Sequence, residues 1–261
     1  MESQFDAAVA AYEASMAEMP FREHIEAHSF LRTVGEVGGL SVLDLGCGSG
    51  TYVRRLRSLG AARVAGVDES GEMIAHARRR EEREGLGVSY AVGNAAGELP
   101  ELDGQFDVVT AVYVLPYAPT RDALAGMCAT ARRALRPEGG RFVAATLNPD
   151  FAEDPGWYRP YGMRLTAPTP RGEGGTGHLT AWIGREVLDV DFFIWSVAAH
   201  EQALRRAGFT HVSWTRPEVS EEGTGLHGAE FWRAYLACPH ALVLDAVAGP
   251  PPGAGAADRR R

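Results

Sequence analysis

A glycine-rich segment and two carboxylates near it are the residues best placed to do chemistry. The run VLDLGCGSG places Gly46, Gly48 and Gly50 at alternate positions directly after a short apolar stretch. Glycines at such a turn let the backbone bend sharply and approach a ligand closely. Asp44 precedes the first glycine by two positions, and Asp68 follows that glycine by 22 residues. In a doubly wound nucleotide site, a carboxylate at this distance binds the ribose hydroxyls.

Two ligands compete for a turn of this kind. The dinucleotide fingerprint G-x-G-x-x-G would need glycine at position 51, where this chain has Thr51. A carboxylate at Asp44 would also repel a pyrophosphate, whereas it suits an ammonium group. A ribose joined to a cationic amino acid, without phosphate, describes S-adenosylmethionine. A nicotinamide-dependent oxidoreductase stays as the alternative enzyme class, and a non-catalytic cofactor-binding protein as the alternative outside enzymes.

The segments that must position these residues alternate between strand and helix. Short apolar runs predict strands over 41–45, 62–68, 87–92, 106–112 and 140–146. Helical periodicity predicts helices over 52–59, 70–84 and 121–134. Strands that alternate with helices imply a mostly parallel sheet in a doubly wound α/β fold.

The flanking segments differ from this alternating region. We expect two N-terminal helices, 2–19 and 21–34, broken at Pro20 because proline ends a helix. After a loop excursion over 148–177, strands 178–184 and 186–195 should form an antiparallel hairpin. A helix over 197–207, strands over 209–214 and 240–246, and a short helix near 229–236 follow. The expected division is a helical lid (1–34), a main domain (35–248) that carries an acceptor-roof insertion (148–195), and a disordered tail (249–261).

Composition excludes several classes of protein. The 261 residues carry a net charge of -8, which disfavours sequence-independent binding to nucleic acid. All 26 basic residues are Arg, so lysine Schiff bases and Walker-type phosphate loops are excluded. The three cysteines have no disulfide or zinc spacing, which favours a reducing cytoplasm. No membrane segment or signal peptide is expected. His24 and His28 lie one helical turn apart but lack a third ligand, so no metal is expected either.

Five motifs resemble the class I S-adenosylmethionine-dependent methyltransferase family. They are VLDLGCGSG, GVDES, GNAAGELP, FDVVTAVYVL and LRPEGGRFV, in family order over residues 40–147. The resemblance implies a seven-stranded Rossmann-like sheet and S-adenosylmethionine as cofactor. It also implies that Asp44 and the backbone around Gly46 hold the methionine part, and that Gly48 and Gly50 allow close approach beneath the cofactor. The ribose and adenine would be bound by Asp68, Glu69, Met73, Asn94 and Ala95; Asn94 stands where the family usually has Asp.

A narrower resemblance involves the N-terminal segments. FDAAVAAYEASM, REHIEAHSFLRTVGEV and the later FFIWS are similar to toxoflavin-type and related bacterial natural-product N/O-methyltransferases. In such enzymes an N-terminal tyrosine and arginine cover the cofactor, and the matching residues here are Tyr12 and Arg22. This resemblance implies a role in bacterial secondary metabolism.

The acceptor side is expected to combine aromatic side chains with few proton-transfer groups. Tyr113, after the fourth strand, and His178, at the start of the hairpin, are the catalytic candidates. A planar acceptor would stack on aromatic side chains of the roof. The substrate-binding candidates are Tyr117, Tyr158, Phe193, Trp195 and His227. His200, His211 and His240 are interpreted as structural.

The resulting expectation is a methyltransferase that acts on nitrogen or oxygen of a small planar metabolite, heteroaromatic or phenolic. A nucleic-acid methyltransferase is disfavoured because the N/D-P-P-Y/F tetrapeptide is missing after the fourth strand, where this chain reads YVLP. The expected partner is a small-molecule acceptor, without nucleic acid or membrane, bound by a monomer or homodimer.

Overall fold

The computed structural model describes residue 5 and residues 9–137 and 139–249. Its centre is a seven-stranded sheet in the order β3-β2-β1-β4-β5-β10-β9. The first five strands of this order pair in parallel, and β10 is antiparallel to both β5 and β9. These strands are β1 (Ser41–Leu45), β2 (Arg63–Asp68), β3 (Ser89–Val92), β4 (Val108–Val112), β5 (Arg141–Leu147), β9 (Phe209–Thr215) and β10 (Ala241–Ala248). The predicted mostly parallel, doubly wound sheet is confirmed.

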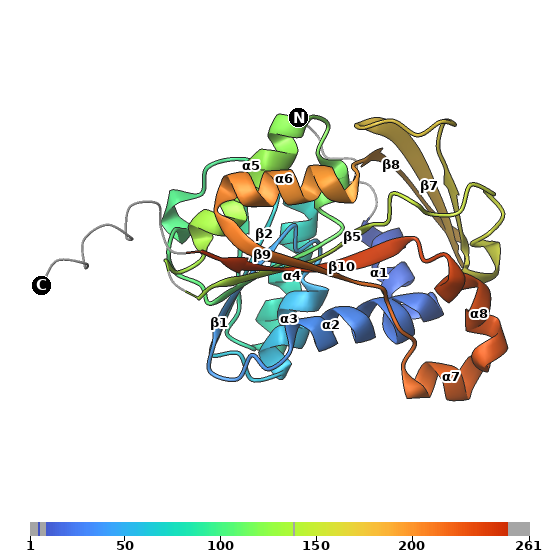
Figure 1. Cartoon of the computed structure of the whole chain (residues 1–261). Helices are drawn as coiled ribbons and strands as arrows, with labels where there is room; N and C mark the ends of the chain where they lie inside the picture. The colour runs from blue at the N-terminus through green and yellow to red at the C-terminus, as the bar shows by residue number, and fades with distance from the viewer. Residues whose placement is uncertain (1–4, 6–8, 138, 250–261) are drawn as a thin grey trace, which may run out of the picture.

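Helices cover both faces of this sheet (Figure 1). One face carries α5 (Arg121–Ala134) and α6 (Val197–Ala207); the other carries α2 (His28–Val34), α3 (Thr51–Ser58) and α4 (Gly71–Glu84). Alternation along β1 explains the two cores, because Val42 packs on the second face while Leu43 and Leu45 pack on the first. Because β1, β2 and β4 are parallel, their carboxyl ends meet at one edge of the sheet, where a ligand site is expected.

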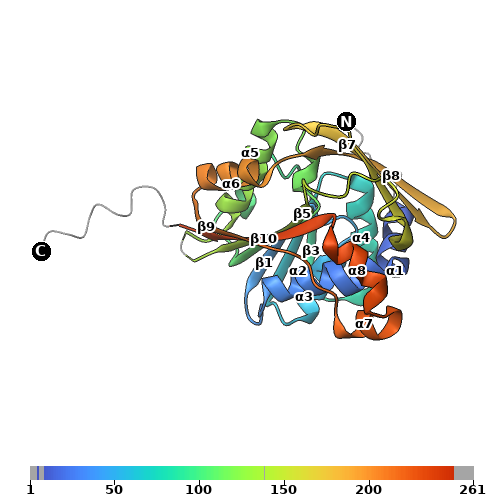
Figure 2. The ribbon, with the colours of Figure 1, turned by 45° about the vertical axis from the view of Figure 1, so that its right-hand side comes forward.

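A second, smaller sheet lies beside that edge, as Figures 1 and 2 show from two directions. Its order is β6-β7-β8, with β6 (Met163–Thr166) and the hairpin of β7 (Gly175–Ile183) and β8 (Glu186–Ile194) all antiparallel. The helix α1 (Val9–Glu18) packs against both hairpin strands. The predicted hairpin is confirmed.

The structure adds three features to the expected elements. Strand β6 lies inside the excursion predicted as loop, and α7 (Glu221–His227) precedes α8 (Ala229–Ala237) in the segment where one short helix was expected. The second N-terminal helix contains a π-helical turn over Arg22–Ala27. The predicted disordered tail (249–261) lies outside the described residues except for Gly249, which is buried and donates from its amide to the Gly208 carbonyl. The first part of the predicted helix 2–19 also lies outside them, apart from Phe5.

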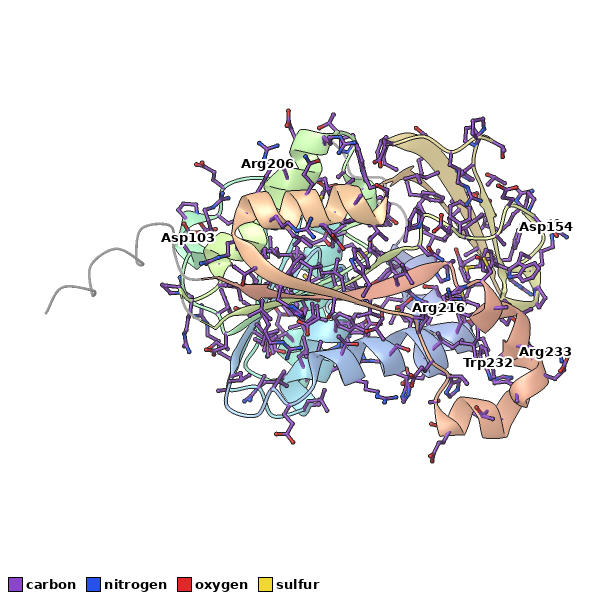
Figure 3. The ribbon with its side chains drawn as sticks, in the orientation of Figure 1. Asp103, Asp154, Arg206, Arg216, Trp232 and Arg233 are labelled. Atoms are coloured by element: carbon purple, nitrogen blue, oxygen red, sulfur yellow. The ribbon has the colours of Figure 1, made fainter. Side chains whose placement is uncertain are left out.

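A third hydrophobic core joins the N-terminal helices, the small sheet and α8. Trp232 on α8 is completely buried there, whereas its neighbour Arg233 is turned outward (Figure 3). Trp232 donates from its indole nitrogen to the Gly223 carbonyl at 2.8 Å, so α7 and α8 are tied together. This core fixes the hairpin above the carboxyl edge of the main sheet.

Candidate active site

The glycine-rich loop after β1 requires its glycines for shape. Gly46 and Gly50 have φ of 66° and 83°, in the left-handed region that favours glycine. A Cβ on Gly46 would lie 2.2 Å from Val114 Cγ2, and a Cβ on Gly50 would lie 2.4 Å from the Tyr90 hydroxyl oxygen. Only glycine at these two positions lets the loop pass this close to Val114 and Tyr90. The backbone of Gly48, between them, faces a cavity.

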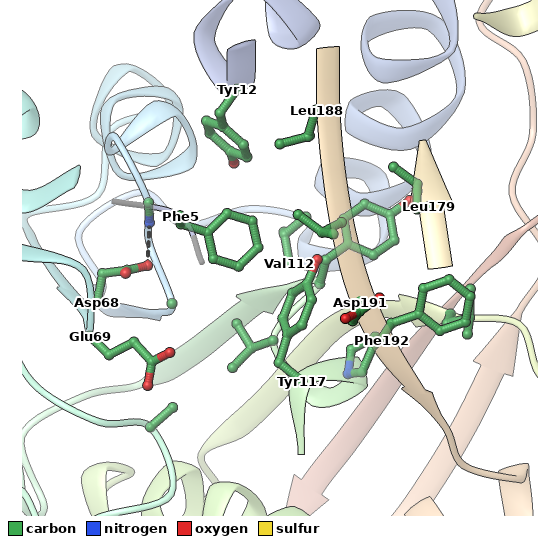
Figure 4. A pocket seen from close by; sticks show the side chains of 18 of the residues that line it. Phe5, Tyr12, Asp68, Glu69, Val112, Tyr117, Leu179, Leu188, Asp191 and Phe192 are labelled. Atoms are coloured by element: carbon green, nitrogen blue, oxygen red, sulfur yellow. Dashed lines mark hydrogen bonds between the residues drawn. The ribbon is translucent and has the colours of Figure 1, made fainter. Parts of the chain in front are cut away.

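Asp68 at the end of β2 closes this loop from the other side. Its Oδ2 accepts from the Gly48 amide at 2.8 Å, and its Oδ1 accepts from the Ser70 amide at 2.9 Å. Figure 4 shows the Asp68 carboxylate and the neighbouring Glu69 on one side of the cavity. Asn94 donates to Glu69 Oε2 at 3.2 Å across the cavity floor. These groups present two carboxylates where a ribose and an adenine would lie.

The cavity has a volume of about 550 Å³ and extends from Asp68 to the small sheet. One part is lined by the carboxyl-edge loops of β1, β2 and β3; the other is lined by β7, β8, the end of β5 and the segment between α1 and α2. Phe5, Tyr12 and Tyr117 lie between these two parts (Figure 4). A cavity of this size is typical of a small-molecule site.

Asp44 lies behind the loop, at 2% exposure and outside the residues that line the cavity. Thr110 Oγ1 donates to its Oδ1 at 2.7 Å. Burial, reinforced by the nearby Asp68 charge, raises the pKa of Asp44 to about 7, although the Thr110 bond opposes the shift. A cation at the loop, such as an ammonium group, would stabilise the ionised carboxylate of Asp44.

A buried ion pair anchors the N-terminal helices over the cavity. Arg22 Nη1 donates to both oxygens of Glu26, at 3.0 and 2.8 Å, and Tyr52 donates to Glu26 Oε1 at 2.8 Å. The Arg22 guanidinium carbon lies 5.5 Å from the Tyr12 ring centre and 5.7 Å from the Tyr113 ring centre. The Nε of Arg22 is buried with no hydrogen-bond partner among the described residues. An acceptor of hydrogen bonds in the cavity would satisfy it.

Tyr113 follows β4 and lines the cavity between the glycine-rich loop and the part under the hairpin. It has φ of 54°, the one positive value at a non-glycine position in the described chain. Its hydroxyl lies 2.9 Å from His240 Nε2, and Tyr235 binds His240 Nδ1 at 2.7 Å. Burial, and then the Arg22 charge, lower the pKa of His240 to about 3, so this imidazole is neutral near pH 7. Burial raises the pKa of the Tyr113 hydroxyl, which therefore also stays neutral.

Known proteins resemble the region that builds the loop. Residues 42–139 match the methyltransferase domain family. The ubiquinone biosynthesis O-methyltransferase of Xanthomonas euvesicatoria is 34% identical over 119 residues, which are 46% of this chain and 48% of that protein. That of Pseudomonas aeruginosa strain PAO1 is 33% identical over 112 residues, 43% of this chain and 46% of that protein. The chain thus spans about half the length of the curated relatives it matches.

Solved structures resemble most of the chain. An S-adenosylmethionine-dependent methyltransferase from Mesorhizobium loti is 26% identical with a TM-score of 0.57, over 81% of this chain and 92% of that chain. A putative enzyme of the same description from Listeria monocytogenes has a TM-score of 0.62 and 24% identity, over 86% and 96%. The chain carries a class I S-adenosylmethionine-dependent methyltransferase domain. This confirms the broader family resemblance and S-adenosylmethionine as cofactor; the toxoflavin-type resemblance stays a prediction.

The residues around the cavity fit this cofactor. Asp44 would stabilise its ammonium group, the Asp68 carboxylate would accept from its ribose hydroxyls, and the unpartnered Arg22 Nε would donate to its methionine carboxylate. The backbone at Gly46 and Gly48 is accessible from the cavity because glycine has no side chain. The assignment of single residues to single cofactor groups remains our proposal.

Most predicted cofactor residues do line the cavity. The exceptions are Asp44, which is buried behind the loop, and Gly50, at the end of the loop. The lining members of the predicted set are Tyr12, Arg22, Gly46, Gly48, Asp68, Glu69, Met73, Asn94 and Ala95. The structure therefore brings together residues that the sequence separates by more than 80 positions.

The predicted acceptor residues are corrected in part. Tyr113, Tyr117 and Phe193 line the cavity, but Tyr158, Trp195 and His227 do not. Tyr158 is fully buried and donates to the Cys238 carbonyl at 2.8 Å, while Trp195 donates to the Ala118 carbonyl at 2.9 Å. His227 stacks on Phe231 in α8, with ring centres 5.1 Å apart. These three residues pack the framework because their polar atoms or ring faces are already used.

His178 also lies outside the lining of the cavity. It is on the outer face of the hairpin, where its Nδ1 is 2.8 Å from Asp191 and its Nε2 is 3.1 Å from Asp189. The hydrogen bond with Asp191, and the further one with Asp189, raise the pKa of His178. Two carboxylates thus favour the charged imidazolium, which is the wrong state for a base. Its predicted catalytic role has no geometric support.

The sequence interpretation missed several lining residues. His240 was interpreted as structural, but it is 3% exposed and faces the cavity through Tyr113. Ser15, Met19 and Phe21 also line it. A signal existed for Glu26, since an Arg and a Glu four residues apart on one helix can pair. No such signal predicted that His240 would face the cavity, because its position depends on how β10 lies beside β5.

Proposed function

We propose that the protein transfers a methyl group to a nitrogen or oxygen atom of a small metabolite whose reacting ring is planar, heteroaromatic or phenolic. S-adenosylmethionine, when bound, supplies the methyl group as a sulfonium substituent. The single observation that carries this proposal is the continuous cavity that extends from Asp68 and the glycine-rich loop to the space under the hairpin. A planar ring that carries the nitrogen or oxygen acceptor could stack on the aromatic side chains of Tyr12, Tyr113 and Phe193, which line the cavity.

The residues of the chain support alignment more than proton transfer. Methyl transfer from a sulfonium group depends on positioning and on exclusion of water. His240 stays neutral with both nitrogens bound to tyrosine hydroxyls, and Tyr113 stays protonated. Tyr113 therefore orients the acceptor by a hydrogen bond rather than by removing its proton.

We also propose that residues 1–34 act as a lid over the main domain (35–248), with the segment 148–195 as the roof of the acceptor chamber. Tyr12 and Arg22 line the cavity from above, and Glu13 bonds Ser49 beside the glycine-rich loop. A role in bacterial secondary metabolism and a monomeric or homodimeric state remain predictions. Among the described residues, no helix is long and apolar enough to cross a membrane.

A methyl-transfer screen tests the function directly. The protein is incubated with isotopically labelled S-adenosylmethionine and a panel of phenols and nitrogen heterocycles, and products are identified by mass spectrometry. We expect a labelled methyl group on nitrogen or oxygen of at least one planar compound. Tight binding of NAD in place of the methyl donor would support the nicotinamide alternative and overturn the proposal.

A further inference from the structure

The far part of the cavity is walled mainly by aliphatic side chains from separate segments. The hairpin supplies its inner face, because Leu188 and Val190 on β8 alternate with outward-facing residues. Met163 at the start of β6 lies in register with Ala181 and Leu188 and extends this face of the small sheet, while Leu147 at the end of β5 lines the cavity from the main sheet. The aliphatic and sulfur-containing lining here comprises Met19, Leu147, Met163, Leu179, Ala181, Leu188 and Val190. We call this space the aliphatic chamber.

The aromatic stacking surface expected from the sequence is present only in part, since Tyr117 and Phe193 line the cavity. The core behind the chamber holds other aromatic side chains that pack against one another rather than line it: Tyr158, Tyr161, Trp232 and Tyr235. Near the hairpin, Phe21, Phe192 and Phe193 line the cavity. The chamber therefore suits methylene and methyl groups better than a second planar ring.

The charged groups around the chamber are already paired or assigned to the cofactor. Arg22 is the basic side chain among the described lining residues; its Nη1 donates to both oxygens of Glu26, and we assigned its buried Nε to the methionine carboxylate of the cofactor. His240 is neutral, and Asp191 binds His178 at the chamber edge. A carboxylate or phosphate placed here would lose water without gaining a cation, which is costly. The chamber thus selects against anions.

We propose that the acceptor is an uncharged molecule with an aliphatic segment, and that this segment lies in the aliphatic chamber under the β7–β8 hairpin. This inference rests on the proposed function and names the substrate class of the same site. The reacting ring would lie near Tyr113, and the aliphatic segment would extend away from the cofactor loop. Burial of the segment excludes water and holds the ring in place.

Binding of 4-alkylphenols tests the inference without requiring turnover. Calorimetry is performed on the protein loaded with S-adenosylhomocysteine, using the 4-ethyl, 4-butyl and 4-hexyl compounds. Each added methylene should tighten binding by about fourfold until the chamber is full. The anionic 6-(4-hydroxyphenyl)hexanoate carries a carboxylate on the chain that would enter the chamber, so it should bind at least about tenfold more weakly than 4-hexylphenol. Affinity that is independent of chain length, or equal affinity for the hexanoate, would overturn the inference.

Two neighbouring residues of β8 provide a matched pair of variants. Leu188 is 9% exposed and lines the chamber, whereas Val187 is 50% exposed on the opposite face. Leu188→Asn should flatten the dependence on chain length by placing an amide in the wall, and Val187→Asn should leave it unchanged. If Leu188→Asn fails to fold, Ala181→Leu serves instead, because Ala181 pairs with Leu188 and a larger side chain there fills the chamber. That variant should weaken 4-hexylphenol more than 4-ethylphenol.

The two proposals fail in different ways in this experiment. Lack of S-adenosylhomocysteine binding contradicts the proposed function, and the alkylphenol series can then be run on the free protein to decide the inference alone. Normal S-adenosylhomocysteine binding with no effect of chain length contradicts the inference only. Equal responses of Leu188→Asn and Val187→Asn would likewise place the aliphatic segment outside the chamber.

Discussion

Replacing Asp68 by Asn should weaken cofactor binding while keeping the shape of the side chain. In the structure, both carboxylate oxygens accept from backbone amides, Gly48 at 2.8 Å and Ser70 at 2.9 Å, so the carboxylate is held in one orientation toward the cavity. We propose that it also accepts from two ribose hydroxyls. Hydrogen bonds to a charged group contribute about 1.5 kcal/mol or more each, so two of them give about 3 kcal/mol. That corresponds to a loss of about 100-fold in affinity.

Isothermal titration with S-adenosylhomocysteine measures this loss. The control is Asp103→Asn, since Asp103 lies on the surface with its Oδ1 4.0 Å from Arg133 Nε (Figure 3). The control variant should bind like the parent protein. A decrease smaller than about threefold in Asp68→Asn, less than one charged hydrogen bond is worth, would refute the assignment of Asp68 to the ribose. Thermal unfolding of both variants separates a binding defect from a folding defect.

Four further predictions concern Asp44, His178, Tyr113 and the N-terminal segment 1–19. Since the pKa of Asp44 is raised to about 7, the folded state binds its proton more tightly than the unfolded state, and stability falls between about pH 4 and pH 7. In urea unfolding, Asp44→Asn should remove about 2 kcal/mol of the stability difference between pH 5 and pH 8, while weakening cofactor binding. His178→Ala should slow methyl transfer by less than about tenfold, because a lost general base typically costs more. Tyr113→Phe should slow transfer with unchanged cofactor affinity in calorimetry. Removing residues 1–19 should abolish turnover, which a labelled-methyl assay would measure, because that segment supplies one wall of the cavity.

The main sheet could be predicted closely from the sequence because its signals are local. The run SVLDL is buried on both faces and begins and ends where the apolar residues do, giving β1 over Ser41–Leu45. Helices α5 and α6 likewise have the predicted bounds, since Thr120 and Ser196 cap them by accepting from the amides three residues later. The π-helical turn at Arg22–Ala27 was not predicted, because an Arg and a Glu four residues apart are equally compatible with an ordinary α-helix.

The cofactor part of the site was also predictable, but the acceptor part was not. The residues around Asp68 follow strand ends whose positions are fixed by the sheet order, so a motif places them in space. The roof depends on which face of each hairpin strand turns inward and on contacts across the chain. Tyr158 and Trp195 looked available for an acceptor, yet their polar atoms bind the carbonyls of Cys238 and Ala118. Aromatic composition alone cannot distinguish a core from a lining.

Tyr113 shows how the two parts of the site depend on each other. Its backbone amide donates to Ala145 on β5 at 2.8 Å, and its positive φ turns the chain so that Val114 closes over Gly46. A tyrosine in this backbone region costs on the order of 1–3 kcal/mol. The structure maintains it because the hydroxyl is held by His240, within the same buried group of side chains as Glu26 and Arg22 of the N-terminal segment. If that segment is the lid we propose, its displacement should remove contacts from Tyr113, and methyl transfer should require the segment, the glycine-rich loop and β10 in place together.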